Sequence, residues 1–253
     1  MRLSLTPFLL VAEFGFLFIV ASRAARSAPG QRMMRPVYAY LLWLTGYGVV
    51  AVVLGARGAY VSDALLPTLP GLWLPVVPVV VAVVPVVVFG SVRTGLRCIV
   101  DVTPWHWFAY FHTLRIAALG SAYKTMIGEF PAFFEYAVGI PDLLFGLSAV
   151  WIAGKAKRGE IGARDFLAWN LIGVLVIVPS TPILLQLGLP GPLQLFTRLP
   201  DARAVFAHPM SIAPMVGVPL FVLVNLCVAW RLWERSRGTG RGTISLAASS
   251  SLP

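Results

Sequence analysis

The sequence predicts an all-α protein, a polytopic transmembrane bundle of about seven helices with its N-terminus outside the cell and its C-terminus in the cytoplasm. Three observations predict it: the composition, the spacing of apolar runs, and the distribution of basic residues between those runs. Of the 253 residues, 58% are hydrophobic and only 12% are charged, and the mean hydropathy is +0.83. A soluble domain carries about a quarter charged residues, so little of this surface is suited to water.

The apolar runs have the length that a membrane crossing requires. A helix needs about 20 mostly apolar residues to cross the hydrocarbon. We expect a single transmembrane domain over residues 1–235, with spans at about 5–22, 37–56, 71–90, 105–124, 131–154, 166–188 and 209–233. The segment 236–253 is rich in Gly, Ser and Thr without an apolar period, which predicts a disordered cytoplasmic tail.

Two of these spans are unusual. The third, LWLPVVPVVVAVVPVVVF, would be typical of a strand or loop in water, but in lipid each backbone group must be paired within its segment, which favours a kinked helix. In the sixth span, Pro179 and Pro182 flank Ser180 and Thr181, so we expect the helix to break or kink there.

Basic residues gather in alternate connections, which sets the orientation. Fourteen lie in the segments assigned to the cytoplasm and five in those assigned to the outside. The cytoplasmic set is Arg23, Arg26, Arg32, Arg35, Arg93, Arg97, Lys155, Lys157, Arg158, Arg164, Arg231, Arg235, Arg237 and Arg241; the outside set is Arg2, Arg57, Lys124, Arg198 and Arg203. Arginines follow the first span rather than precede it, which favours a retained helix over a cleaved signal peptide. The expected location is the bacterial inner membrane.

Arg115 and Asp142 are the central candidates for a functional site. At a rise of about 1.5 Å per residue, Arg115 lies ~15 Å deep from one face and Asp142 ~16 Å deep from the other. The fourth and fifth spans are joined by a short connection, so the two residues should pair near the midplane as neighbours in a hairpin. His112, three residues before Arg115, and Glu13 of the first span are candidate members of this polar centre.

Further polar and small residues accompany this centre. The same hairpin geometry brings Lys124 and Glu135 together as a second, outer charged rung. Asn170, Ser180, Thr181 and Gly146 are expected at helix-packing or kink positions. Two interpretations of the buried charges carry equal weight: a pair that only fixes helix register, and the wall of a polar cavity.

Other classes of site receive little support. A net charge of +10 is typical of nucleic-acid binding when the basic residues lie on one soluble face. Here the basic residues lie beside apolar spans. The expected partner is therefore the lipid bilayer and not nucleic acid. A membrane-protein partner or a homo-oligomer is compatible with the sequence. The three histidines and two cysteines have no ligand spacing, so we predict no metal and no cofactor.

The second half of the chain resembles a family of uncharacterised multi-pass bacterial membrane proteins. The residues that carry the resemblance are FHTLRIAALG, EFPAFFEYAVGIPDLLFGLSA, the Trp-Asn of LAWNLIG, and HPMSIAPMVGVPLFVLVNL, over about 108–233. The resemblance emphasises Arg115, Asp142, Gly146, Trp169, Asn170, Pro209, Pro214 and Pro219. It implies a topology and no activity.

Three function classes remain, in this order. The first is a small transporter or permease-like protein that uses the Arg115–Asp142 centre. The second is a structural or assembly subunit of a membrane complex. The third is a membrane-embedded histidine-dependent enzyme or haem protein. The sequence favours a protein that is not an enzyme.

Overall fold

The computed structural model describes residues 5–27 and 33–249, and within these ranges every regular element is a helix. Among the described residues, five helical segments are long and apolar enough to cross a membrane: Thr6–Ala25, Met34–Ala56, Pro70–Val88, Ala132–Arg158 and Ala213–Arg237. They coincide with the first, second, third, fifth and seventh predicted spans. The all-helical class is thereby confirmed, and the apolar helices fit a protein of the membrane.

The first half contains three of these segments. Its elements are α1 (Thr6–Ala25), α2 (Met34–Ala56), the 3-10 turns η1 (Ala59–Val61) and η2 (Leu66–Thr68), α3 (Pro70–Trp73), α4 (Val76–Val88) and α5 (Gly90–Val102). The third predicted span is α3 followed by α4, with Pro75 between them and Pro85 inside α4.

The second half contains helices that change type along their length. Its elements are α6 (Trp105–His112), the 3-10 segment η3 (Thr113–Ala118), α7 (Leu119–Met126), α8 (Ala132–Phe134), the π-helix η4 (Glu135–Gly139), α9 (Ile140–Arg158), α10 (Ala163–Leu175), α11 (Thr181–Gly188), α12 (Arg203–Phe206), the π-helix η5 (Ala213–Gly217) and α13 (Val218–Ser249). The fourth and sixth predicted spans are therefore interrupted. The fourth changes to a 3-10 helix at Thr113, and the sixth breaks between Leu175 and Thr181, at the predicted Pro-Ser-Thr-Pro segment.

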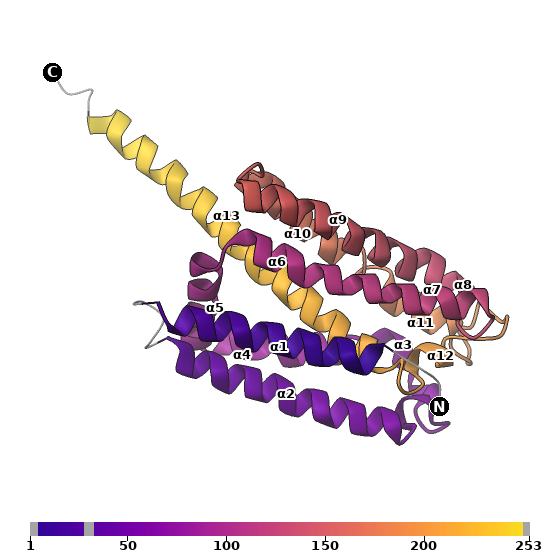
Figure 1. The fold of residues 1–253 in the computed structure, drawn as a ribbon. Helices are drawn as coiled ribbons and strands as arrows, with labels where there is room; N and C mark the ends of the chain where they lie inside the picture. The colour runs from indigo at the N-terminus through magenta and orange to yellow at the C-terminus, as the bar shows by residue number, and fades with distance from the viewer. Residues whose placement is uncertain (1–4, 28–32, 250–253) are drawn as a thin grey trace.

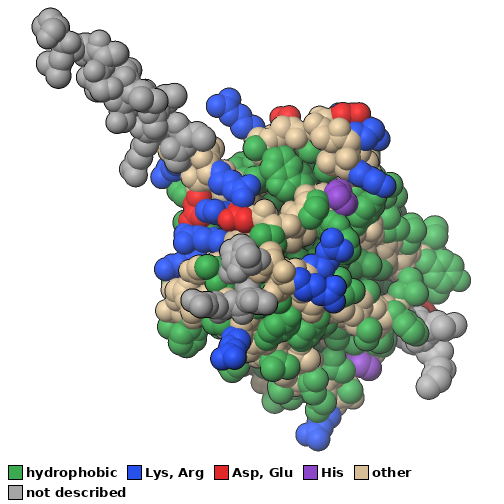
Figure 2. Space-filling view, turned by 60° about the vertical axis from the view of Figure 1, so that its left-hand side comes forward, with side chains coloured by type: hydrophobic (Ala, Val, Ile, Leu, Met, Phe, Trp, Pro, Cys, Tyr) green, Lys and Arg blue, Asp and Glu red, His purple; other side chains and the backbone are tan. Residues whose placement is uncertain are grey.

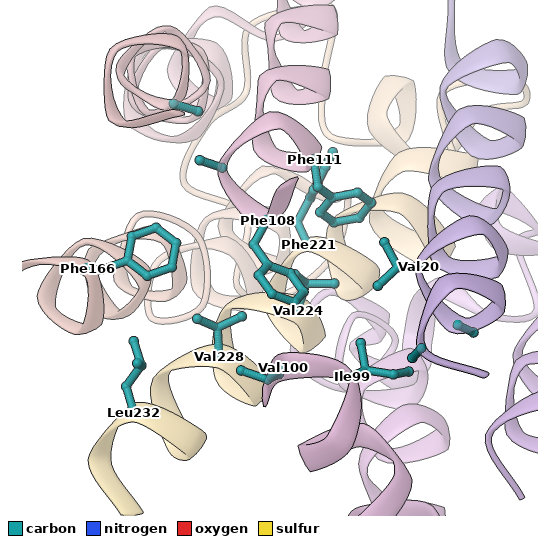
Figure 3. Close-up of a cluster of buried hydrophobic side chains, with 14 of the residues drawn as sticks. Val20, Ile99, Val100, Phe108, Phe111, Phe166, Phe221, Val224, Val228 and Leu232 are labelled. Atoms are coloured by element: carbon teal, nitrogen blue, oxygen red, sulfur yellow. The ribbon is translucent and has the colours of Figure 1, made fainter. Parts of the chain in front are cut away.

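The helices lie side by side around two apolar clusters (Figure 1). The helix α6 packs along α9, and α10 packs along α13. Figure 3 shows one cluster, in which Phe108 and Phe111 of α6 meet Phe221 and Val224 of α13. Large apolar side chains also face outward, among them Phe8, Trp151 and Leu175, which are 74%, 60% and 64% exposed. Lipid chains would cover such faces, whereas water would make them an aggregation hazard.

The helices α1 and α9 end at one end of the bundle, where α5 lies and from which α13 projects (Figure 1). Figure 2 turns this end toward the viewer and shows Lys and Arg side chains spread over it. Acidic partners hold α5 to α13 there. Arg231 makes two hydrogen bonds to the Asp101 carboxylate, at 2.8 and 2.7 Å, Arg235 contacts the same carboxylate, and Arg97 pairs with Glu234.

The Asp101 carboxylate should make the stability of this end depend on pH. Burial alone would raise the pKa of Asp101, but the hydrogen bonds from Arg231 and the charges of Arg235 and Arg231 outweigh burial and lower it. The pairing therefore stabilises the fold above the ordinary pKa of a carboxyl group, and the contribution is lost as the pH falls through the lowered value. We expect Asp101→Asn to cost less than about 1 kcal/mol at pH 7 because the cluster is partly exposed. Thermal unfolding in detergent should show the two proteins converging in acid; a difference that persists undiminished into strong acid would contradict this assignment.

The helix α13 continues through Ser249, whereas the composition predicts disorder from residue 236. Residues 236–249 thus differ from the prediction, and 250–253 lie outside the described residues. Extension of a formed helix adds one hydrogen bond per residue without a new nucleus, which allows it to run past its apolar part.

Candidate functional site: a cavity above a buried ion pair

The structure brings Arg115 and Asp142 together. Nη1 of Arg115 donates to Oδ1 of Asp142 at 2.8 Å and to the carbonyl oxygen of Gly173 at 3.1 Å. The Arg115 side chain is fully buried and that of Asp142 is 14% exposed. The ion pair offsets part of the free energy that burial of the two charges costs, whereas either charge alone would keep the full cost of its desolvation.

Aromatic rings and a glycine fix the position of Arg115. Its guanidinium carbon lies 4.7 Å from the centre of the Phe145 ring and 4.9 Å from that of Phe221. On the facing helix α9, a side chain at Gly146 would place its Cβ 3.0 Å from Cβ of Arg115. Glycine at 146 therefore lets α9 approach η3 closely enough for the ion pair to form.

Glu13 and His112 lie near this pair without a hydrogen bond to it. The Glu13 carboxylate is completely buried against Gly217 of η5, and Arg115 and Asp142 act on it electrostatically. Neither of its oxygens has a hydrogen-bond partner among the described residues. The His112 ring is enclosed by aromatic rings, with Trp169 at 5.5 Å and Phe145 at 5.7 Å between ring centres, and both of its nitrogens lack a partner in the same part of the chain.

A cavity of about 760 Å³ lies directly beside Arg115 and Asp142. Its wall comes from the beginnings of α1, α4 and α11, from η3 and α7, from η4 and α9, and from η5 and α13. Tyr123, Ile127 and Glu129 belong to the wall and are exposed, so the cavity opens where α7 ends. Leu5 before α1 and Val76 of α4 are exposed parts of the same wall. Most of the wall is apolar.

Lys124 and Glu135 both line this cavity but do not form the predicted charged rung. Neither carboxylate oxygen of Glu135 has a partner in the described residues. The side chain lies over Gly139, where a Cβ would be 2.7 Å from Oε1. The expectation was wrong because depth along a helix does not specify the direction of a side chain around it, and the π-helical turn at Glu135 shifts that direction from the α-helical one.

The predicted packing residues take separate places. Asn170 donates from Nδ2 to the Phe166 carbonyl oxygen at 2.8 Å, and Trp169 donates from Nε1 to Oγ of Ser148 at 3.0 Å. Thr181 lines the cavity, and Ser180 stands at the break before α11. Gln186 accepts a hydrogen bond from the backbone N–H of Gly71 at 3.0 Å and so joins α11 to α3.

Sequence reasoning missed Asn225, a fully buried side chain of α13 that lies against Gly173. A single Asn within the apolar run VPLFVLVNLC was the signal that could have found it. In residues 5–27 and 33–249, no three His, Cys, Asp or Glu side chains come close enough to hold a metal ion.

The apolar helices and the buried ion pair define a helical protein fitted to a membrane, with a charged pair at the wall of a cavity. The family model of a domain of unknown function, DUF8737, matches residues 91–233, and since this is more than half of the chain, the protein belongs to that family. No curated protein and no solved structure matches. The resemblance to a family without an assigned activity is confirmed. The matched region begins in α5 and contains Arg115, Glu135 and Asp142, whereas Glu13 precedes it.

Proposed function

We propose that this protein is a small permease-like protein of the bacterial inner membrane, with seven spans, its N-terminus outside and its C-terminus in the cytoplasm. Five spans are the long apolar helices, and the interrupted segments α6–η3–α7 and α10–α11 supply the other two. The end that carries most of the basic side chains is assigned to the cytoplasm by the positive-inside rule.

The cavity that reaches the Arg115–Asp142 pair is the observation that carries this proposal. Its wall contains residues from each irregular segment of the second half: η3, η4, the break after α10, and η5. Irregular backbone at membrane depth is tolerated where it lines a cavity or is buried in protein, and π-helical turns are frequent at functional sites. The concentration of four such segments around one space supports a binding site.

Access to the cavity is proposed from the outside. The mouth lies at the end opposite the basic surface, where α7 finishes. Toward the basic end, the apolar cluster with Phe108, Phe111 and Phe166 fills the space between α6, α10 and α13 (Figure 3). Passage of a solute would require these helices to separate, and the breaks at η3 and before α11 are the natural places for such a movement.

Cysteine accessibility tests the topology and the cavity together. In a variant without Cys98 and Cys227, Ala118→Cys places a thiol in the cavity wall, and Val150→Cys places one on an outward apolar face. A membrane-impermeant thiol reagent added outside should label Ala118→Cys and leave Val150→Cys unlabelled, because lipid covers Val150.

Two reference thiols make the result decisive. Ser62→Cys and Gly162→Cys mark the connections expected outside and inside, so only the first should react in intact cells. Labelling of Gly162→Cys from outside would overturn the orientation. Failure of Ala118→Cys to react from either side, with the references behaving as expected, would show that the cavity is closed to water and would overturn the permease-like function.

A further inference from the structure

The charges of the cavity wall do not balance. Arg115 and Asp142 neutralise each other through their ion pair, and Lys124 and Glu129 bring one charge of each sign toward the mouth. Glu135 is the remaining ionisable group that the wall contributes apart from the Tyr123 phenol. The cavity therefore has an excess of one carboxylate when all five charged groups are ionised.

Glu135 is buried, and no positively charged side chain of the described residues is paired with it. It is 1% exposed, and both oxygens lack a hydrogen-bond partner among the described residues. The hydroxyl of Ser121 on α7 is near enough to act as a donor to Glu135, and in this structure it is placed to donate to the Ala118 carbonyl oxygen at 2.8 Å, so the carboxylate has at most one neutral donor that it must share. A buried carboxylate without a positive partner carries a desolvation cost that an incoming cation would relieve.

The rest of the cavity wall suits the apolar part of a ligand. Tyr123, Phe130, Phe134 and Phe221 contribute aromatic rings, and Val and Leu side chains supply much of the remainder. Aromatic faces attract cations, and a cavity of this volume is in the range that accepts drug-sized molecules. A strongly hydrated inorganic cation would lose its water here without oxygen ligands to replace it.

We propose that the cavity binds a lipophilic organic cation and that Glu135 is its counter-ion. This inference rests on the proposed function, since it assigns a substrate class to the same cavity. The Glu135 side chain belongs to the cavity wall, and its carboxylate lies over Gly139, at the first residue of a π-helical turn, with its oxygens covered. Lys124 lines the same cavity, but among the described residues no ion pair joins it to Glu135. The ion pair of Arg115 with Asp142 then serves to hold η3 and α9 together and does not contact the charge of the ligand.

Binding of tetraphenylphosphonium to the purified full-length protein in detergent tests the proposal. Equilibrium dialysis, corrected with detergent-only blanks, should show saturable binding to the wild type. Glu135→Gln keeps the shape of the side chain and removes its charge, and it should weaken binding by more than about tenfold. Glu160→Gln, an exposed acid outside the cavity wall, is the matched control and should change the dissociation constant by less than about twofold.

A second variant separates the position of the carboxylate from its charge. In Gly139→Ala the new methyl group would lie where the Glu135 carboxylate now rests, so the charge is kept but displaced, and binding should weaken. Tetraphenylborate, of similar shape and opposite charge, should show no saturable binding to the wild type when it is dialysed alone under the same conditions.

The outcomes distinguish this inference from the function on which it rests. Absence of saturable tetraphenylphosphonium binding to a monodisperse wild-type protein, or equal binding by Glu135→Gln, would overturn the cation assignment; a proton would then be the occupant that Glu135 accepts. If Ala118→Cys is still labelled from outside, the permease-like cavity stands even then. If the reagent does not label Ala118→Cys from either side, the proposed function itself is contradicted.

Discussion

Replacement of Arg115 by leucine is expected to lower the free energy of unfolding by about 3–5 kcal/mol, because it leaves the Asp142 carboxylate buried without its partner. Asp142→Leu should have a similar effect, since it leaves a fully buried guanidinium with only the Gly173 carbonyl oxygen as acceptor among the described residues. The double variant should recover a large part of the loss, because two apolar side chains need no partner. Unfolding of the purified proteins in mixed detergent micelles measures all three.

The exposed pair Arg158–Glu160 is the control for the charge change itself. Its side chains are 58% and 49% exposed, so Arg158→Leu should leave the free energy of unfolding nearly unchanged. A double variant Arg115→Leu/Asp142→Leu that is as unstable as either single change would show that the two residues depend on other groups, of which Glu13 is the first candidate because it interacts electrostatically with both.

The result also bears on what the pair is for. If the double variant is stable, the fold does not require these charges, and a role at the cavity is what remains to account for them. If stability is lost without recovery, the pair belongs to the framework that holds η3 against α9. Neither result tests the role of Glu135, because Glu135 lines the same cavity as the Arg115–Asp142 pair but takes no part in the hydrogen bonds of the pair.

The sequence predicts the continuous helices well and the local irregularities poorly. A run of apolar residues specifies a crossing by length alone, so the first and second spans coincide closely with α1 and α2. The break near Pro179 was also predictable, because proline cannot donate the helical hydrogen bond. The 3-10 segment at Thr113–Ala118 contains no proline or glycine, so no local residue signals the change. It depends on packing against α9, which the sequence does not display.

The candidate site was likewise predictable only in part. Depth along each helix can be counted from the sequence, and this count places Arg115 and Asp142 at the same level. Rotation about the helix axis cannot be counted across a π-helical turn, and the Lys124–Glu135 rung failed there. The cavity depends on side chains from several separate segments, and the volume that they leave empty has no signature in any one of them.

Gly71→Ala is expected to destabilise the fold by about 3 kcal/mol, near the upper end of what overpacking usually costs. A Cβ at Gly71 would lie 2.5 Å from Cα of Gln186, so it would meet backbone rather than a side chain that could turn away. The same contact contains the hydrogen bond from the Gly71 N–H to Oε1 of Gln186. Separation of α3 from α11 would break that bond and leave the Gln186 amide buried without its partner, which adds to the steric cost.

Gly15→Ala and Gly46→Ala provide the matched controls for this prediction. Both glycines lie within long helices, and a Cβ at either would have no neighbouring heavy atom within 4 Å. Alanine there should leave stability unchanged or raise it by about 0.5–1 kcal/mol, because it lowers the conformational entropy of the unfolded chain. Thermal unfolding of the three variants in the same detergent separates the contact from the general effect of the substitution. A Gly71→Ala protein as stable as the two controls would mean that α3 does not pack closely on α11. The positions of Pro75 and Val76, which follow α3 and belong to the cavity wall, would then no longer be fixed by that contact.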